Sequence, residues 1–168
     1  MSTPVTTTVD ARFGDDGEPP LPWSDTEELL ESAQLYWLST VRRDGVPHVT
    51  PLIGLWHAGG FVFCTGPGEQ KTHNLRHNDA VAVTTGVATW AAGTDVVVEG
   101  RAHRVTDGDA LHAVAEAYYV KYGQQWRFEV HGDAVGPVDD PGWVFRVVPS
   151  KVLVFAKGPF GQTTHRFA

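Results

Sequence analysis

The sequence predicts a single, mostly β domain, a closed antiparallel barrel flanked by helices. Strand-like segments outnumber segments with helical spacing by more than two to one, and no alternation of strand and helix repeats along the chain. Asp44-Gly45 and Gly59-Gly60 separate strand-like runs in the manner of hairpin turns. A chain of 168 residues, 42% of them hydrophobic, is long enough for one core and too short for two ordinary domains. We therefore expect one barrel domain over residues 23–168.

The N-terminal part of the chain has the composition of a flexible arm. Residues 1–22 contain a threonine cluster, several glycine and proline breaks and few large apolar groups, too few to order the segment alone. The run Ser24-Asp25-Thr26-Glu27 has the pattern of a capping box, which predicts that a short first helix begins there.

The remaining elements follow from periodicity and breakers. Strands are expected at residues 35–42, 46–56, 61–65, 80–85, 95–105, 143–148 and 151–156. A second helix is expected to begin near Glu69, and a main amphipathic helix to follow a capping box at Thr106 and Asp109 and to end before Gly123. Residues 130–142 are rich in glycine, proline and aspartate and are expected to form a loop. No strand is expected in the tail that begins at Gly158.

The strand over residues 46–56 contains two prolines, which predict an unusual position in the sheet. Pro47 and Pro51 cannot donate to a ladder, so this strand belongs on an edge or at a bulge. Free backbone groups of Thr50, Leu52 and Ile53 would then be available to a planar heterocycle, and Gly54 would permit its close approach. An irregular edge strand without a ligand is the alternative, and the pattern leaves it open.

A strand that breaks at glycine and restarts as a helix predicts an anion site between residues 61 and 75. Gly66-Pro67-Gly68 is the break, and the N–H groups of the following turn, with a solvent-exposed Lys71, are expected to hold a phosphate. An ordinary connection with a solvated lysine is the alternative. The loop is not a Walker A motif, because Gln70 stands where that motif has glycine.

Composition disfavours several classes of partner and compartment. The net charge is −7 and the 13 Lys and Arg residues are scattered, so nucleic acid is disfavoured. No run of 18 apolar residues occurs, and no signal peptide or membrane span is expected. The one cysteine, Cys64, cannot form an internal disulfide, which favours the cytoplasm.

The sequence contains no recognisable set of catalytic side chains. His73 and His77 share a helical face, but no third ligand has a recognisable spacing, so we expect no metal site. Neither a nucleophile elbow nor a catalytic triad is recognisable. This pattern is typical of proteins in which a cofactor supplies the chemistry.

Three segments and the tail resemble a known family. They are Trp37–Pro51, Phe63–Leu75, Asp95–Asp107 and the Thr-x-x-Arg-Phe pattern that ends at Phe167. With these residues the chain resembles the pyridoxamine-phosphate-oxidase-like, FMN-binding split β-barrels, most closely their actinobacterial flavin/deazaflavin oxidoreductase branch. The resemblance implies a homodimer with two cofactors, deazaflavin coenzyme F-420 or FMN, in clefts between the subunits.

The resemblance also implies positions for the cofactor. The strand Val49–Gly54 would lie along the isoalloxazine ring, and Lys71 with Asn74 would approach the phosphate. The cofactor-binding residues expected from both lines of reasoning are Val49, Thr50, Pro51, Leu52, Ile53, Gly54, Thr65, Gly66, Lys71, Asn74 and Arg166. Gln70 stands where classical pyridoxamine phosphate oxidases have arginine, and the chain ends in Arg166-Phe167-Ala168. These departures favour the deazaflavin branch, although that branch usually has tryptophan where His165 stands.

Three functions are compatible with these observations. The first is an oxidoreductase that passes a hydride from reduced coenzyme F-420 to a small unsaturated or heteroaromatic substrate. The second is an FMN-dependent oxidase or flavin reductase of the same fold, and the third is a non-catalytic cofactor- or haem-binding protein. A dimer is expected in each case, with Trp56 and Trp90 suited to a buried partner surface.

Overall fold

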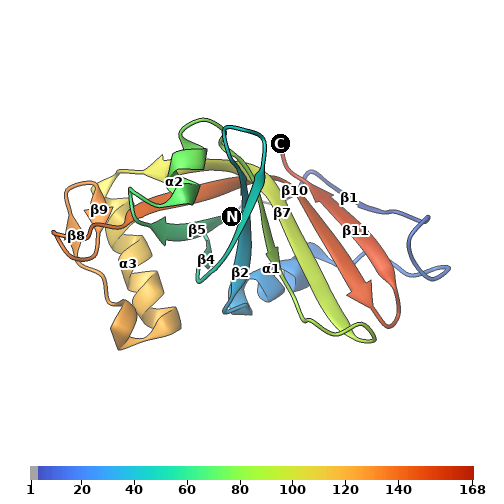
Figure 1. Cartoon of the computed structure of the whole chain (residues 1–168). Coiled ribbons are helices and arrows are strands. Elements are labelled where there is room, and N and C mark those ends of the chain that lie inside the picture. The colour runs from blue at the N-terminus through green and yellow to red at the C-terminus, as the bar shows by residue number, and fades with distance from the viewer. Residues whose placement is uncertain (1–3) are drawn as a thin grey trace.

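The computed structural model describes residues 4–168 and shows a mostly antiparallel β fold with a few helices (Figure 1). The strands are β1 (Thr6–Val9), β2 (Tyr36–Val41), β3 (Pro47–Leu52), β4 (Leu55–His57), β5 (Gly60–Thr65), β6 (Ala80–Thr85), β7 (Gly93–Val105), β8 (Val130–His131), β9 (Ala134–Val135), β10 (Trp143–Lys157) and β11 (Gly161–Arg166). The helices are α1 (Trp23–Ser32), α2 (Gln70–Leu75), α3 (Gly108–Tyr122) and a 3₁₀ turn, η1 (Gln124–Trp126). No helix of the described residues is both long and apolar enough to cross a membrane.

Strand β10 divides the fold into a barrel and a protruding sheet. Its first half, Trp143–Val147, pairs with β5, and its second half, Lys151–Ala156, pairs with β11, while β7 runs along its other edge. The pairing with β7 shifts register between Pro149 and Lys151, where β10 changes partner. The main sheet has the order β1-β11-β10-β7-β6-β2-β3, and β4 and β5 complete the barrel. This arrangement confirms the predicted split barrel.

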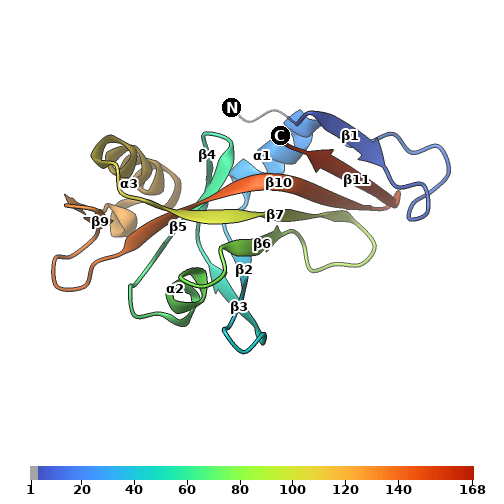
Figure 2. The same cartoon turned by 90° about the horizontal axis from the view of Figure 1, so that it is seen from above.

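Two apolar clusters hold the elements together. The first fills the barrel, with Leu38, Phe61 and Phe63 fully buried and Leu75 of α2 at one end. The second lies under α3, where Leu111 and Tyr118 pack against β4, β5 and β10. Helix α2 packs against the barrel core through Leu75, and α3 covers the outside of β4, β5 and β10 (Figures 1 and 2).

Strand β3 is an edge strand, as its prolines predicted. It pairs with β2 and has no second partner among the strands of residues 4–168. The strand expected over 46–56 is interrupted at Ile53-Gly54, so that the chain leaves β3 and joins β5 through β4. A Cβ at Gly54 would lie 2.4 Å from Cζ of Phe61, so only glycine fits at this bend.

The two ends of the chain differ from the sequence-based expectation. Residues 1–3 of the expected flexible arm lie outside the described residues, but Thr6–Val9 form β1 and pair with β11. The tail itself forms β11 against β10. Both segments are polar and β-branched, and each is ordered by the backbone edge of its neighbour, which local composition does not reveal. The expected strands 143–148 and 151–156 are one strand, and the loop 130–142 contains the small hairpin β8–β9.

Both predicted capping boxes are wrong by one or two residues. Helix α1 is preceded by Pro22 and makes no side-chain cap, because Ser24 already lies inside the helix. Helix α3 is capped by Asp107, whose carboxylate accepts the N–H of Ala110 at 2.9 Å.

Trp56, which was expected to suit a partner surface, is not a surface residue. It packs in the barrel core, and its indole N–H donates to Glu27 at 3.0 Å.

Candidate functional site

The expected anion site is a compact polar network between β5 and α2. Glu69 directly precedes the helix, and its Oε1 accepts the N–H of Gly66 at 2.7 Å and the hydroxyl of Thr65 at 2.9 Å. The hydroxyl of Thr72 donates to the carbonyl of Gly66 at 2.7 Å. The loop is therefore held in shape by side chains on both sides of the Gly66-Pro67-Gly68 break. Helix α2 has only six residues, so these side chains, and not a helix dipole, define the site.

Lys71 is buried, contrary to the expectation of an exposed lysine. Its side chain is only 8% exposed, and its ammonium forms an ion pair with Oε2 of Glu69, whose side chain is 49% exposed. Burial disfavours the Glu69 carboxylate, but the contacts with Lys71, Gly66 and Thr65 outweigh burial and lower the pKa of Glu69. The alternative of a solvated lysine is thus excluded, and a cation is fixed beside the loop.

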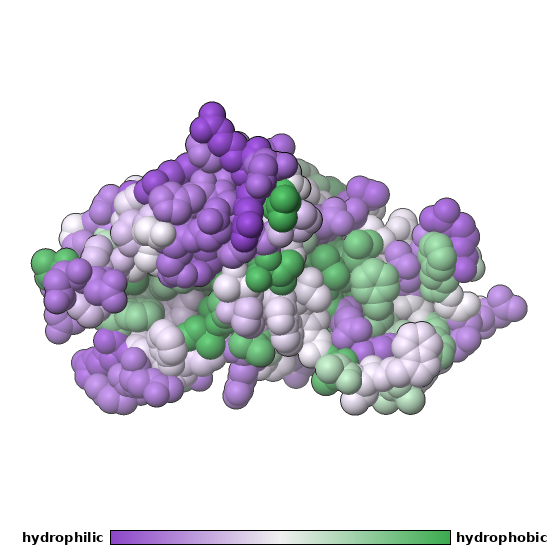
Figure 3. All heavy atoms as spheres, in the orientation of Figure 1, coloured by the Kyte–Doolittle hydropathy of each residue, from purple (hydrophilic) through white to green (hydrophobic). Residues whose placement is uncertain are grey.

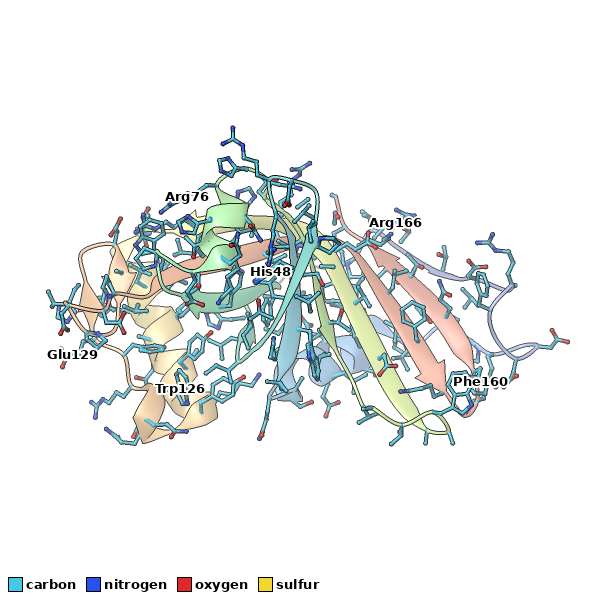
Figure 4. The ribbon with its side chains drawn as sticks, in the orientation of Figure 1. His48, Arg76, Trp126, Glu129, Phe160 and Arg166 are labelled. Carbon is cyan, nitrogen blue, oxygen red and sulfur yellow. The ribbon has the colours of Figure 1, made fainter. Side chains whose placement is uncertain are left out.

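Asn74 connects this network to the edge of the sheet. Its side-chain amide donates to the hydroxyl of Thr40 on β2 at 2.9 Å and accepts from Gln70 at 2.8 Å. Thr40 lies opposite His48 of β3 and donates to its carbonyl at 3.3 Å. The anion loop and β3 are therefore neighbours: Figure 2 shows α2 beside β3, and Figure 4 shows His48 close to α2. Sequence reasoning missed Thr40 and His48, because only the β2–β3 register places them at the site.

The residues of β3 alternate between two environments. Val49 and Pro51 are exposed on the outer face, where Pro51 lies opposite Trp37. Thr50 points to the opposite side, since its cross-strand partner is the fully buried Leu38. Its hydroxyl oxygen is buried and has no hydrogen-bond partner within residues 4–168. An unpartnered buried hydroxyl is unusual, and this one lies on the inner side of β3, away from Val49 and Pro51.

The end of the expected cofactor strand has a structural role. The N–H of Gly54 donates to the hydroxyl of Tyr122 at 3.1 Å, and its carbonyl accepts from Tyr122 at 2.7 Å and from Lys121 at 3.2 Å. The backbone of Gly54 is therefore not free for a ligand. Its lack of a side chain leaves room for the ring of Phe61 instead. Ile53 packs against the cluster under α3, and Leu52 packs against the barrel core.

Arg166 is not brought to the other expected site residues within one chain. It is exposed on β11, paired with Thr6 and Lys151, and four strands separate β11 from β3 in the sheet. Figure 4 shows Arg166 near the end of β11, on the other side of the molecule from Arg76. Within one chain, Arg166 and Lys71 therefore belong to different parts of the sheet.

A tryptophan between two arginines lies next to the anion loop. Trp143 of β10 is the cross-strand neighbour of Thr65, with the guanidinium of Arg104 3.8 Å from its ring centre and that of Arg76 5.4 Å away. Sequence reasoning missed this stack, because its members come from β7, β10 and the end of α2. Arg76 is exposed and adds a positive charge, whereas Arg104 is paired with Asp133 at 2.8 Å.

The other candidate reactive groups show no catalytic setting. His73 Nδ1 lies 3.3 Å from Arg76 Nη1, and no group of three or more His, Cys, Asp or Glu side chains in residues 4–168 is placed to hold a metal ion. Burial raises the pKa of the Cys64 thiol to about 12, so the thiolate is scarce at neutral pH.

The fold and this site define a pyridoxamine-phosphate-oxidase-like split barrel. The family model described as pyridoxamine 5'-phosphate oxidase matches residues 24–155, and the chain belongs to this family. The match ends before β11, so it does not extend to Arg166. No curated protein sequence matches the chain.

Solved structures with the same fold have diverse descriptions. A conserved hypothetical protein from Mycobacterium tuberculosis is similar with a TM-score of 0.67 and 21% identity over 81% of this chain and 85% of the other. A heme binding protein from Mycobacterium smegmatis has a TM-score of 0.67 and 17% identity over 86% of this chain and 59% of the other. An FAD binding protein from the same organism has a TM-score of 0.59 and 20% identity over 88% and 97%. At these identities the likeness shows the fold alone.

Proposed function

We propose that the protein is an oxidoreductase that passes a hydride from the reduced deazaflavin coenzyme F-420 to a small unsaturated or heteroaromatic molecule. The observation that supports this most is the placement of a buried cation, Lys71, close to an edge strand whose outer face exposes Val49 and Pro51. A ligand with an anionic tail and a flat, partly apolar ring matches both features.

The donors around Lys71 fit the anionic part of such a cofactor. The ammonium of Lys71, the hydroxyl of Thr65 and the N–H of Gly66 converge on one carboxylate in the free chain. The same groups are suited to phosphate oxygens, which accept charge-assisted hydrogen bonds. The side-chain amide of Asn74 holds α2 to β2 and so fixes Lys71 relative to β3.

The outer face of β3 fits the ring part. Val49 and Pro51 present a flat apolar surface, and the absence of an N–H at Pro51 leaves no unsatisfied donor there. When bound, a reduced deazaflavin supplies a hydride, because it has carbon where a flavin has its reactive nitrogen. The chain's own residues bind the anionic tail, orient the ring and exclude water from one face.

We further propose a homodimer, because the ring face of β3 is open in one chain. The exposed apolar residues Leu35, Trp37 and Val87 line a groove of about 480 Å³ beside this face. Figure 3 shows hydrophobic groups at the centre of this side of the molecule, below a hydrophilic cap. A second copy could cover this surface and supply Arg166, which four strands separate from β3 in its own chain. Sedimentation with cofactor present should give a dimer, and a monomer at micromolar concentration would contradict the two-subunit site.

Two other functions of the same cleft remain candidates. The first is an FMN-dependent oxidase or flavin reductase, which would use the same donors, and a similar structure is described as an FAD binding protein. The second is a non-catalytic haem carrier, and another similar structure is described as a heme binding protein. In each case we place the protein in the cytoplasm, as its single free cysteine favours.

Absorbance and fluorescence titration distinguish the three functions. Purified protein that is colourless and quenches the fluorescence of added coenzyme F-420, one per chain, supports the deazaflavin enzyme. Flavin absorbance after purification supports the FMN alternative, and a Soret band supports the haem carrier. Consumption of reduced coenzyme F-420 in the presence of a panel of unsaturated and heteroaromatic acceptors then tests hydride transfer. Failure to oxidise the coenzyme with any acceptor would contradict the proposed enzyme.

A further inference from the structure

The three donors assigned to a cofactor phosphate already have an anion of their own. Glu69 accepts from Gly66 N–H at 2.7 Å and from the Thr65 hydroxyl at 2.9 Å, and its second oxygen pairs with the Lys71 ammonium. A carboxylate with these contacts resembles part of a bound phosphate in charge and in the hydrogen bonds it accepts. The two anions could not use the same donors together, because like charges at such a distance repel strongly.

The two partners of the ion pair differ in their freedom to move. The Lys71 side chain is 8% exposed and extends from α2 into the protein, whereas that of Glu69 is 49% exposed. Glu69 itself has extended backbone angles, with φ −75° and ψ 152°, and stands outside the helix. The neighbouring Gly68 has no heavy atom within 4 Å of where its Cβ would be, so there is open space beside the loop. The carboxylate can therefore turn into solvent while the ammonium stays in place.

We propose that Glu69 is an internal competitor of the cofactor phosphate, which occupies the Lys71 site in the free protein and swings out when the cofactor binds. The inference rests on the proposed function. In the free protein Glu69 keeps Lys71 from being a buried, unpaired cation, which would be costly. On binding, the phosphate takes over this pairing, and the cost of releasing Glu69 lowers the affinity. Glu69 thereby sets how tightly a phosphorylated flavin or deazaflavin is held.

The test compares ligands with and without a phosphate. Glu69→Gln keeps an acceptor for Gly66 and Thr65 but removes the charge that competes for Lys71. We expect FMN and coenzyme F-420 to bind about tenfold more tightly to Glu69→Gln than to the wild type, which corresponds to about 1.4 kcal/mol. Riboflavin and the deazaflavin fragment that lacks phosphate should bind both proteins equally. Glu28→Gln, which removes an exposed carboxylate from α1, controls for net charge and should change nothing.

Each outcome has one meaning. Unchanged or weaker binding of the phosphorylated ligands by Glu69→Gln, or equal tightening for riboflavin or for Glu28→Gln, would overturn the inference while leaving the cofactor site intact. Binding of no ligand by either protein would overturn both the inference and the proposed function. If Glu69→Gln does not fold, Glu69→Asp gives the answer, because its shorter carboxylate should pair less well with Lys71. Its affinity for FMN should then rise, and an unchanged or lower affinity would refute the competition.

Discussion

Replacing Lys71 by methionine should weaken binding of phosphorylated cofactors and leave their phosphate-free analogues unaffected. Methionine keeps the length of the buried stem and removes the ammonium, which pairs with Glu69 in the free chain. A charge-assisted hydrogen bond is worth about 1.5–3 kcal/mol. Because the wild type exchanges one anionic partner for another on binding, the net loss should lie near the lower value. We therefore expect FMN and coenzyme F-420 to bind roughly tenfold more weakly.

Stability should change little, since Glu69 is half-exposed and pairs of this kind contribute about 0–1 kcal/mol. Fluorescence titration with FMN and riboflavin measures the effect, and repeating it at higher salt should narrow the difference between wild type and variant. Lys157→Met is the matched control, because Lys157 is also nearly buried and paired with a carboxylate, Asp95, at the opposite end of β10. Equal affinity of Lys71→Met and wild type for FMN, with equal salt dependence, would refute the assignment of Lys71 to the phosphate.

Three further substitutions test other parts of the account. Thr50→Val removes the buried hydroxyl that lacks a partner in residues 4–168, so chemical denaturation should show a gain of about 1 kcal/mol, while cofactor affinity should stay unchanged because the hydroxyl faces away from the ring surface. Burial lowers the pKa of Lys121 to about 8, so between pH 8 and about 10.4 the unfolded chain holds a proton that the folded chain lacks. The unfolding free energy of the wild type should rise over this range relative to Lys121→Met, by about 1 kcal/mol for a partly exposed group. Burial also lowers the pKa of His165, which is neutral between Thr7 and Thr26, so the wild type should lose more stability from pH 7 to pH 5 than His165→Gln. If the unfolding free energy of the wild type has the same pH dependence as that of Lys121→Met, the lowered pKa of Lys121 is contradicted. The same comparison with His165→Gln applies to His165.

The strands that the sequence predicts well are those with strong local patterns. The limits of β6 are as expected, and those of β2, β5 and β7 differ by only one or two residues, because alternation, β-branched residues and hairpin turns act within a few residues. The prolines of β3 similarly predicted an edge strand. The elements that were missed, β1 and β11, depend on a neighbouring backbone edge that lies far away in the sequence.

The sequence indicated a candidate loop but not the contacts within it. The glycine break and the resemblance at Lys71 and Asn74 pointed to this loop, yet no sequence pattern indicates that Lys71 is buried or that Glu69 turns back onto it. The first depends on how α2 packs against the barrel core, and the second on the fold of the loop between Thr65 and Lys71. At Gly54 the sequence predicted that another group approaches the backbone closely, and a planar ligand was expected. The structure shows that the approaching group is the ring of Phe61.

A crystal structure of the protein with coenzyme F-420 or FMN would test the central claim most directly. The account predicts a cofactor phosphate within hydrogen-bond distance of Lys71 Nζ, with the ring along Val49–Pro51 and the Glu69 carboxylate turned away from Lys71. A cofactor bound elsewhere on the barrel, with the Lys71–Glu69 ion pair still intact, would contradict it.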